Sequence, residues 1–276
     1  MASPDYRFSR PLDAPKIRAL SLGGGVQSCT LAFMSARGDL EPLDFAIFSD
    51  TGHEPRLVYE YLDWMEPQLP FPIVRVRRDG RTLAEHTVAI ANGEIPRGPM
   101  PPLYTSEPKG MLPKQCSKEF KVRPVERHIR DLLGLEPRQR GPKEVLVELW
   151  IGISRDEIER LGRSEKKYIH HRHPLIEQGM TRAACLRWME ERQLRLPVKS
   201  SCIFCPFRDQ PAWRRMKLEQ PEDFALACEI DDAMRPGWPG MTGQAFVHRQ
   251  MVPLRDADLN ESQLDFEFEC EGHCNT

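Results

Sequence analysis

The sequence lacks the features that mark a membrane-spanning or secreted protein. It has no run of about 18 consecutive apolar residues, so it predicts no transmembrane helix. The segment Met1 to Arg7 is polar and predicts no signal peptide. Net charge is also nearly absent, at −2 over 276 residues, so the chain as a whole is not an electrostatic nucleic-acid binder. We therefore expect a cytoplasmic protein that does not bind membranes.

The composition is that of a globular protein. Hydrophobic residues make up 40% and charged residues 29% of the chain, which has room for one large α/β domain with a smaller appendage. The chain has eight cysteines and no secretion signal. In that setting cysteines usually serve metal, cluster or redox chemistry rather than disulfides.

Three consecutive glycines, Gly23 to Gly25, follow the apolar stretch 17–22 and precede a helical pattern that starts near Gln27. Glycine has no Cβ, so backbone N–H groups in such a turn can approach an anion, and a helix N-terminus adds a positive dipole end. The turn has neither the lysine of the common P-loop nor the Gly-x-Gly-x-x-Gly spacing. The pattern predicts a phosphate or pyrophosphate site, with an ordinary strand–helix turn as the alternative.

Strand and helix patterns alternate along the first half of the chain. Strands are predicted at 17–22, 45–48, 73–76 and 145–151, and helices at 27–37 and from Pro55 onward. This alternation predicts a parallel twisted sheet flanked by helices, with ligands at the carboxyl ends of its strands. Both 23–28 and 50–54 fall at such ends.

The rest of the chain is less regular. We expect a proline-rich loop at 91–115, a short strand near 168–170, and helices at 117–133, after Ser154, and at 181–192, 213–216 and 221–234. The predicted organisation is an irregular arm (1–16), a nucleotide-binding α/β domain (17–195) and a cysteine-containing, partly helical C-terminal region (196–276), irregular from 235 onward.

The cysteines fall into two groups. Cys29, Cys185 and Cys228 lie in apolar helical patterns and are expected to be core residues. Cys202 and Cys205 form a Cys-x-x-Cys pair, which can bind one metal centre from a single turn. A pair is too few for zinc or a cluster, and the better candidates for the missing ligands stand in polar, loop-like contexts: Cys116, Cys270 and Cys274.

Several motifs, in order, resemble the phosphoadenylylsulfate reductase family of the PP-loop ATP pyrophosphatases. The glycine turn resembles the loop Ser-Gly-Gly-x-Asp-Ser, and the similarity extends over about 17–230. The other matching segments are Asp50-Thr51-Gly52, Lys114 to Pro124, Gly152 to Arg160, Pro174-Leu175, Trp188 and Ser201 to Pro206. The resemblance implies an adenine nucleotide alpha-hydrolase-like fold and these nucleotide-binding residues: Ser21, Gly23, Gly24, Gly25, Gln27, Ser28, Asp50, Thr51, Gly52, Gly152 and Arg160.

The sequence departs from the family at informative positions. Gln27 replaces an aspartate of the loop, and Ser154 replaces an arginine of the substrate anion site. Gln115 replaces one cysteine of an adjacent pair, which leaves three matching cluster ligands. The resemblance implies a 4Fe-4S cluster on Cys116, Cys202, Cys205 and Cys274, with Cys270 as an alternative fourth ligand or an open iron. The C-terminal Glu269-Cys270-Glu271-Gly272-His273 is similar to the segment that carries the reductases' nucleophile.

The first functional hypothesis is ATP-dependent adenylation followed by sulfur transfer to an acceptor, such as a nucleic acid base or backbone. This reaction would require ATP or a related adenine nucleotide, Mg²⁺, the cluster and a sulfur-donor protein. The second is a sulfonucleotide reductase with Cys270 as nucleophile. The third is a non-catalytic nucleotide-binding subunit of a modification or defence complex, with zinc in place of the cluster.

A histidine- and arginine-containing stretch at 163–173 has two interpretations. His170, His171 and His173 are metal-ligand types, but the neighbouring Arg163, Lys166, Lys167 and Arg172 favour a solvated basic face. Such a face is also the best sequence candidate for a nucleic-acid contact.

Overall fold

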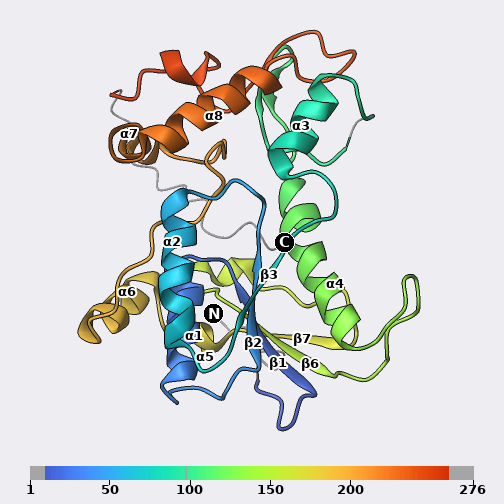
Figure 1. Cartoon of the computed structure of the whole chain (residues 1–276), viewed down its shortest axis with the longest axis vertical. Helices are drawn as coiled ribbons and strands as arrows, with labels where there is room; N and C mark the ends of the chain where they lie inside the picture. The colour runs from blue at the N-terminus through green and yellow to red at the C-terminus, as the bar shows by residue number, and fades with distance from the viewer. Residues whose placement is uncertain (1–9, 97, 261–276) are drawn as a thin grey trace, which may run out of the picture.

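The central sheet has five parallel strands in the spatial order β3-β2-β1-β6-β7 (Figure 1). They are β1 (Ile17–Leu22), β2 (Phe45–Ser49), β3 (Ile73–Val76), β6 (Val147–Ile151) and β7 (Ile169–Arg172). The computed structural model describes residues 10–96 and 98–260. Ser21 is in register with Ile47 and with Ile151, so the carboxyl ends of β1, β2 and β6 meet at one edge. The expected class, a parallel sheet flanked by helices, is confirmed.

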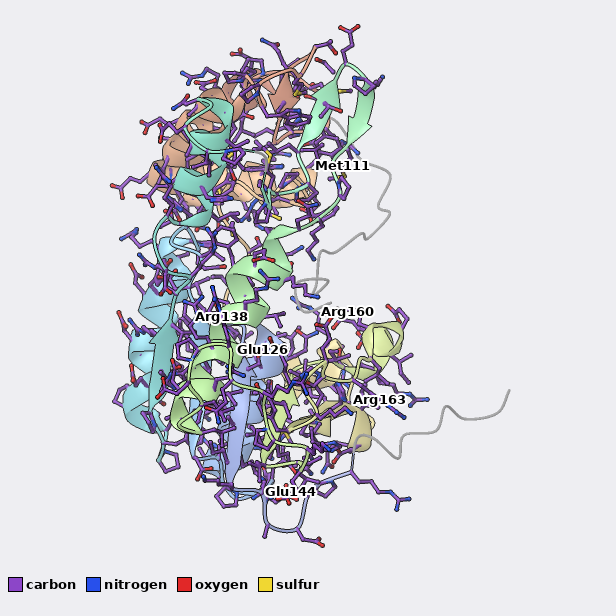
Figure 2. The ribbon with its side chains drawn as sticks, turned by 90° about the vertical axis from the view of Figure 1, so that its right-hand side faces the viewer. Met111, Glu126, Arg138, Glu144, Arg160 and Arg163 are labelled. Atoms are coloured by element: carbon purple, nitrogen blue, oxygen red, sulfur yellow. The ribbon has the colours of Figure 1, made fainter. Side chains whose placement is uncertain are left out.

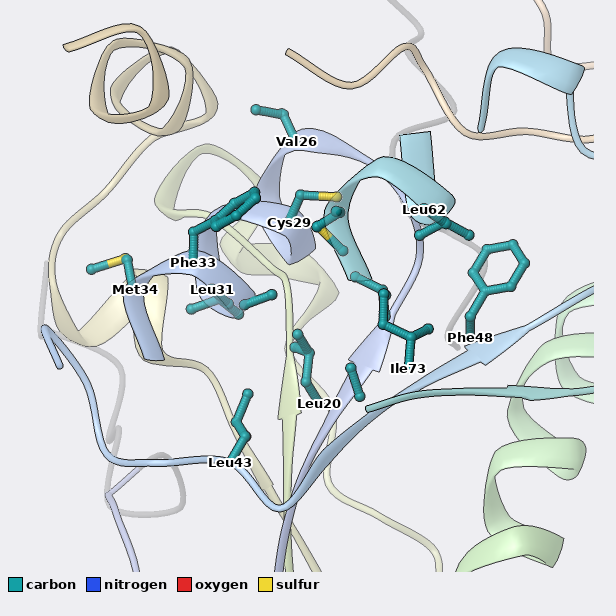
Figure 3. Packing of buried hydrophobic residues seen from close by; sticks show 14 of the residues in the cluster. Leu20, Val26, Cys29, Leu31, Phe33, Met34, Leu43, Phe48, Leu62 and Ile73 are labelled. Carbon is teal, nitrogen blue, oxygen red and sulfur yellow. The ribbon is translucent and has the colours of Figure 1, made fainter. Parts of the chain in front are cut away.

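Alternating strand side chains supply a separate core on each face of the sheet. Four helices cover one face: α1 (Val26–Ala36), α2 (Arg56–Met65), α5 (Pro174–Glu177) and α6 (Arg182–Glu191). There Leu20 and Phe48 from the strands pack with Cys29 and Leu62 from the helices (Figure 3). Helix α4 (Arg123–Leu132) covers the other face, where Ile129 joins the second core. The even and odd positions of β1 therefore face different cores, as its period of two requires.

A third core lies beyond the carboxyl edge of the sheet, at the top of Figure 1. It is built from α3 (Leu83–Ala91), α7 (Gln210–Glu219), α8 (Pro221–Met234) and an antiparallel sheet β5-β4-β8. The strands of that sheet are β4 (Tyr104–Ser106), β5 (Lys109–Met111) and β8 (Ala245–Phe246). The C-terminal region expected to begin at residue 196 thus shares its core with residues 83–120.

Several elements differ from those predicted. Helix α3 was not expected, and the proline-rich stretch predicted as a loop contains the β4–β5 hairpin. The hairpin is short and polar, and β4 pairs with β8, which lies far away in the sequence. No local sequence pattern therefore predicts this sheet. The helix predicted from Ser117 opens with a π-helical turn (Lys118–Val122), and the helix predicted after Ser154 is a 3₁₀ turn (Arg155–Arg160).

The remaining expectations concern burial. Cys29, Cys185 and Cys228 are buried in the cores, as predicted. Trp213 of α7 is 1% exposed and also belongs to a core. None of the helices that the structure describes is long and apolar enough to cross a membrane.

Gly152 brings the end of β6 against the first turn of α1. A Cβ added at Gly152 would lie 2.9 Å from the backbone nitrogen of Ser28 and 3.1 Å from its Cα. Backbone atoms at the start of a buried helix cannot move aside as the end of a flexible side chain can. The close approach therefore requires glycine at this position.

We predict that Gly152→Ala destabilises the fold by about 1–3 kcal/mol, the usual range for an overpacked interior. Gly162→Ala is the matched control, because a Cβ there meets nothing within 4 Å. Chemical denaturation of both variants measures the difference. Equal stability of the two variants would show that α1 can shift without cost.

Candidate functional site

The three glycines connect β1 to α1 in a tight turn. Gly24 has a φ of +77°, which favours glycine, and a Cβ there would lie 3.1 Å from Val58 Cγ1. Gly25 is the N-cap of α1 and forms no side-chain cap hydrogen bond. Ser28 Oγ accepts from the Gly23 N–H at 3.1 Å and donates to the Gly25 carbonyl at 3.2 Å, which fixes the turn. The start of α1 thus combines uncapped backbone N–H groups with a positive dipole end.

A cavity of about 120 Å³ opens at this turn, and we call it the glycine-turn cavity. Seven of the residues predicted from sequence line it: Ser21, Gly23, Gly25, Gln27, Ser28, Gly152 and Arg160. Its other lining residues include three further cations, Lys121, Arg182 and Lys199, whereas none of the described lining residues is an aspartate or glutamate. An uncapped helix start and four basic side chains suit an anion such as phosphate.

The two departures from the family pattern in this region contact each other. Gln27 Nε2 donates to Ser154 Oγ at 3.3 Å and to Glu157 Oε2 at 2.8 Å. Glu157 also pairs with Arg160, at 2.5 Å between Glu157 Oε1 and Arg160 Nη1. Burial raises the pKa of Glu157 although Arg160 opposes this shift. This network fixes Gln27 and Arg160, both of which line the cavity.

The segment Asp50-Thr51-Gly52 lies outside the glycine-turn cavity. Asp50 Oδ1 accepts from the Gly52 N–H and from the Tyr59 hydroxyl, each at 2.7 Å, and Oδ2 accepts from Arg77. Burial alone would raise the pKa of Asp50, but the hydrogen bonds from Arg77, Tyr59 and Gly52 hold it below its usual value. A Cβ on Gly52 would lie 2.5 Å from Thr82, so this glycine serves close packing. Asp50 therefore organises the loop after β2 instead of lining the anion cavity.

A buried carboxylate joins three chain segments beside the cavity. The side chain of Glu54 is wholly inaccessible to solvent; its Oε1 pairs with Lys121 Nζ at 3.1 Å, and its Oε2 accepts from Ser200 Oγ at 3.0 Å. Lys121 and Ser200 both line the glycine-turn cavity. Glu54 thus sets the positions of two lining residues.

Three cysteines meet in a second, smaller cavity of about 30 Å³, which we call the cysteine pocket. It is lined by Cys116, Cys202 and Cys205 together with Thr51, Lys114, Ser117 and Lys121, among others. The Cys202 sulfur lies 3.1 Å from Thr51 Oγ1. Burial raises the pKa of the Cys202 thiol well above its ordinary value. Cys116 thus lines the same pocket as the Cys202/Cys205 pair, whereas the role of the three as metal ligands stays a prediction.

The cysteine sulfurs of this pocket are the type of ligand that a thiolate-bound metal group needs. They are not, however, spaced so as to hold a metal ion. The sulfurs are soft ligands, and the buried Nζ of Lys114 and Oγ of Ser117 have no hydrogen-bond partner among the described residues, as expected next to a negatively charged group. Within residues 10–96 and 98–260, however, no three histidine, cysteine or carboxylate side chains are arranged to hold a metal ion. The predicted ligand Cys274 and the predicted nucleophile Cys270 lie outside the described residues.

A third cavity, of about 270 Å³, adjoins the glycine-turn cavity and shares Ser21 and Arg160 with it. Its walls include apolar side chains of β6 and α4, such as Leu149 and Val125, together with charged side chains such as Glu126. Figure 2 shows Glu126 on α4 opposite Arg160 and Arg163. This cavity has the mixed apolar and polar walls that small-molecule sites usually have.

One short segment forms a wall of all three cavities. Cys116 and Ser117 line the cysteine pocket, and Lys118 and Val122 line the third cavity. Lys121 lies between them and lines both the glycine-turn cavity and the cysteine pocket. The π-helical turn from Lys118 to Val122 thus presents neighbouring residues to different cavities, and π-turns often occur at functional sites.

The predicted basic face at 163–173 is only partly present. Arg172 is 3% exposed and binds the buried Glu148 along with Glu41 and Glu177, because the alternation of β7 turns this side chain into the protein. His173 is also buried, and burial lowers its pKa to about 3. Interpreting these two residues as solvent-facing was therefore wrong, whereas Arg163 and Lys167 are exposed.

Three cavity cations were not selected from the sequence: Lys121, Arg182 and Lys199. Lys121 had a usable signal, because it lies in the segment from Lys114 to Pro124 that resembles the family. Arg182 and Lys199 follow elements that return to the glycine turn only in three dimensions, so spacing alone did not indicate them.

No family model and no curated protein sequence matches the chain. Among solved structures, the chain is similar to phosphoadenylyl-sulfate (PAPS) reductase from Candida auris in a phosphate complex. The TM-score is 0.44 at 14% sequence identity, over 67% of this chain and 76% of that one.

The partners of Asp50 yield a prediction with a defined pH dependence. Tyr59→Phe removes a hydrogen bond to a charged group and should lower the free energy of unfolding by about 1.5 kcal/mol at pH 7. Because the pKa of Asp50 is depressed in the folded state, its stabilising effect is present above about pH 4 and is lost as the pH falls through the folded value. Denaturation at several pH values should show the gap between parent and variant shrinking in acid. A gap that does not change with pH would assign the loss to packing or to the second hydrogen bond, which Tyr59 Oη accepts from the Glu54 N–H at 3.3 Å.

Proposed function

We propose that this protein is an enzyme that binds an adenine nucleotide, with the anionic end in the glycine-turn cavity and sulfur chemistry at the cysteine pocket. The observation that carries the proposal is the position of Lys121, which lines both cavities. A group bound at the turn would therefore lie next to the cysteines. The resemblance of the sequence to PP-loop proteins supplies the class of nucleotide.

Magnesium, which the resemblance implies, does not fit the residues at the turn. Mg²⁺ in nucleotide sites is usually held through one or two carboxylates as well as the phosphates. The described lining of the glycine-turn cavity has none, and the nearby Glu54 and Glu157 are paired with Lys121 and Arg160. A wall of cations without carboxylates favours a nucleotide whose charge the protein itself neutralises.

This favours sulfonucleotide reduction over ATP-dependent adenylation. A cysteine thiolate attacks the sulfonate sulfur, the bond from sulfur to the phosphate oxygen breaks, and its electron pair leaves with the nucleotide. A second thiolate then attacks the cysteine sulfur of the resulting S-sulfonate, which releases sulfite and forms a disulfide. A dithiol reductant restores the two thiols. The resemblance assigns the first attack to Cys270.

The direct test is to assay the full chain, purified without oxygen, for its products. With adenylyl sulfate or phosphoadenylyl sulfate and a dithiol, we expect sulfite and the corresponding sulfate-free nucleotide. Gly25→Val should weaken nucleotide binding at least about tenfold, because the new side chain enters the cavity, where a Cβ meets nothing within 4 Å.

Other products would lead to a different function. AMP and pyrophosphate formed from ATP and an acceptor, such as a nucleic acid, would favour adenylation with sulfur transfer. No turnover with any nucleotide, in a protein that retains zinc, would favour the non-catalytic subunit.

A 4Fe-4S cluster remains part of the proposal. Cys116, Cys202, Cys205 and Cys274 would hold it, and when bound it would supply a polarising, electron-rich centre beside the sulfur group. We expect anaerobically purified protein to contain iron and sulfide and Cys202→Ala to lose both. Cys185→Ala is the control, because Cys185 is buried in another core and should leave the metal content unchanged. Iron retained in full by Cys202→Ala would remove Cys202 from the ligands.

A further inference from the structure

The third cavity takes no part in the proposed function, although it is larger than the other two. Leu149 and Ile151 of β6, Ile169 of β7 and Val125 of α4 line it. Each of these residues is at most 6% exposed. An apolar or aromatic ligand gains dispersion contacts against such walls. The volume of about 270 Å³ lies close to the lower end of the usual range for small-molecule sites, so it suits a single ring system.

His171 contributes a hydrogen-bond acceptor to the lining of this cavity. Its Nδ1 lies 3.2 Å from the Gly162 carbonyl oxygen, which can only accept, so Nδ1 carries the hydrogen. Burial lowers the pKa of His171 below its usual value, so the ring is neutral at pH 7. In a neutral imidazole with its hydrogen on Nδ1, the other nitrogen, Nε2, is an acceptor. A ligand can therefore donate an N–H to this residue.

Glu126 contributes a second acceptor, which is charged. Its side chain is 19% exposed and forms an ion pair with Lys166 at 3.7 Å, which is longer than a hydrogen bond. Burial raises the pKa of Glu126 more than the charge of Lys166 lowers it. A hydrogen-bond donor on a ligand would therefore stabilise this carboxylate.

Cations stand across the cavity from Glu126. Figure 2 shows Arg160 and Arg163 opposite this glutamate. Arg160 pairs with Glu157 and lines both the third cavity and the glycine-turn cavity, so it forms part of the wall between them. A well-matched ligand presents N–H donors on one edge and an acceptor on another. Amino-substituted nucleobases combine an exocyclic amino group with ring acceptors in this way.

We propose that the third cavity binds an amino-substituted aromatic heterocycle of the nucleobase class. Glu126 and His171 accept its N–H groups, and the apolar side chains contact its ring. This ligand is a molecule separate from the nucleotide at the glycine turn, because Arg160, fixed by Glu157, stands between the two cavities. The site goes beyond the proposed function and does not depend on it.

Fluorescence titration of the full chain with 2-aminopurine tests the proposal, because this base is fluorescent and carries an amino group. Glu126→Met should weaken 2-aminopurine binding at least about tenfold, because a charge-assisted hydrogen bond is lost. Glu126→Gln keeps an acceptor oxygen and should weaken binding less. Glu60→Met is the control, because Glu60 is also a helical glutamate with a basic partner, 3.2 Å from Arg56, but lines none of the three cavities.

Three further measurements locate the site and define its ligand. Gly162→Phe adds a ring to the lining at a position where a Cβ meets nothing within 4 Å, so the fold should be kept while affinity for 2-aminopurine falls at least about tenfold. Unsubstituted purine, which has no amino group, should displace 2-aminopurine at least about tenfold less effectively than adenine does. Saturating AMP should leave 2-aminopurine binding to the parent unchanged.

The contrary results each overturn the proposal. A parent protein that does not bind 2-aminopurine, or a Gly162→Phe variant that binds it as the parent does, would remove the site from this cavity. Equal displacement by purine and adenine would remove the amino group from recognition. Displacement of 2-aminopurine by AMP would make the two ligands share one site. Binding of 2-aminopurine by a protein that binds no AMP would keep this inference and count against the proposed function alone.

Discussion

The arrangement around the cavities depends on one buried charge, the carboxylate of Glu54. Its side chain is fully shielded from solvent; Lys121 neutralises its charge, and the Ser200 hydroxyl donates a hydrogen bond to it. Removing one partner of such a pair typically costs about 3–5 kcal/mol, because the other charge remains buried. These contacts tie the loop after β2 to the π-helical turn and to the segment that leads into Cys202. The glycine-turn cavity and the cysteine pocket are therefore held in fixed positions relative to each other through Lys121.

The neutral pair formed by Gln27 and Ser154 gives a second constraint on the site. Where the family pattern has an aspartate and an arginine, this chain places an amide and a hydroxyl in contact, and both charges are lost together. Glu157 then binds the Gln27 amide and Arg160 at once. The cations in the cavity wall are thus Arg160, Lys121, Arg182 and Lys199, of which Arg160 and Lys121 already pair with Glu157 and Glu54.

The glycines in and next to the turn have two different roles: some allow close packing, and one leaves room for an anion. Gly24 is required by its positive φ and by the contact that a Cβ would make with Val58, whereas a Cβ on Gly25 would meet only open space. Gly152 is required because the end of β6 touches the backbone of Ser28. Gly24 and Gly25 are therefore adjacent in the chain although they have different roles, whereas Gly152, just after β6, both packs against α1 and lines the cavity.

The sequence by itself determined the parallel sheet, because strands such as 17–22 and 73–76 and the helices between them are encoded by local periodicity. It also determined the glycine turn and the cysteine pair, whose chemistry depends on adjacent residues. Only the tertiary structure decided that Asp50 is engaged by Tyr59 and Arg77, and that Lys114, Lys121 and Ser117 converge beside the cysteines. Those contacts join residues from separate elements, and their partners are set by burial and packing that no local pattern contains.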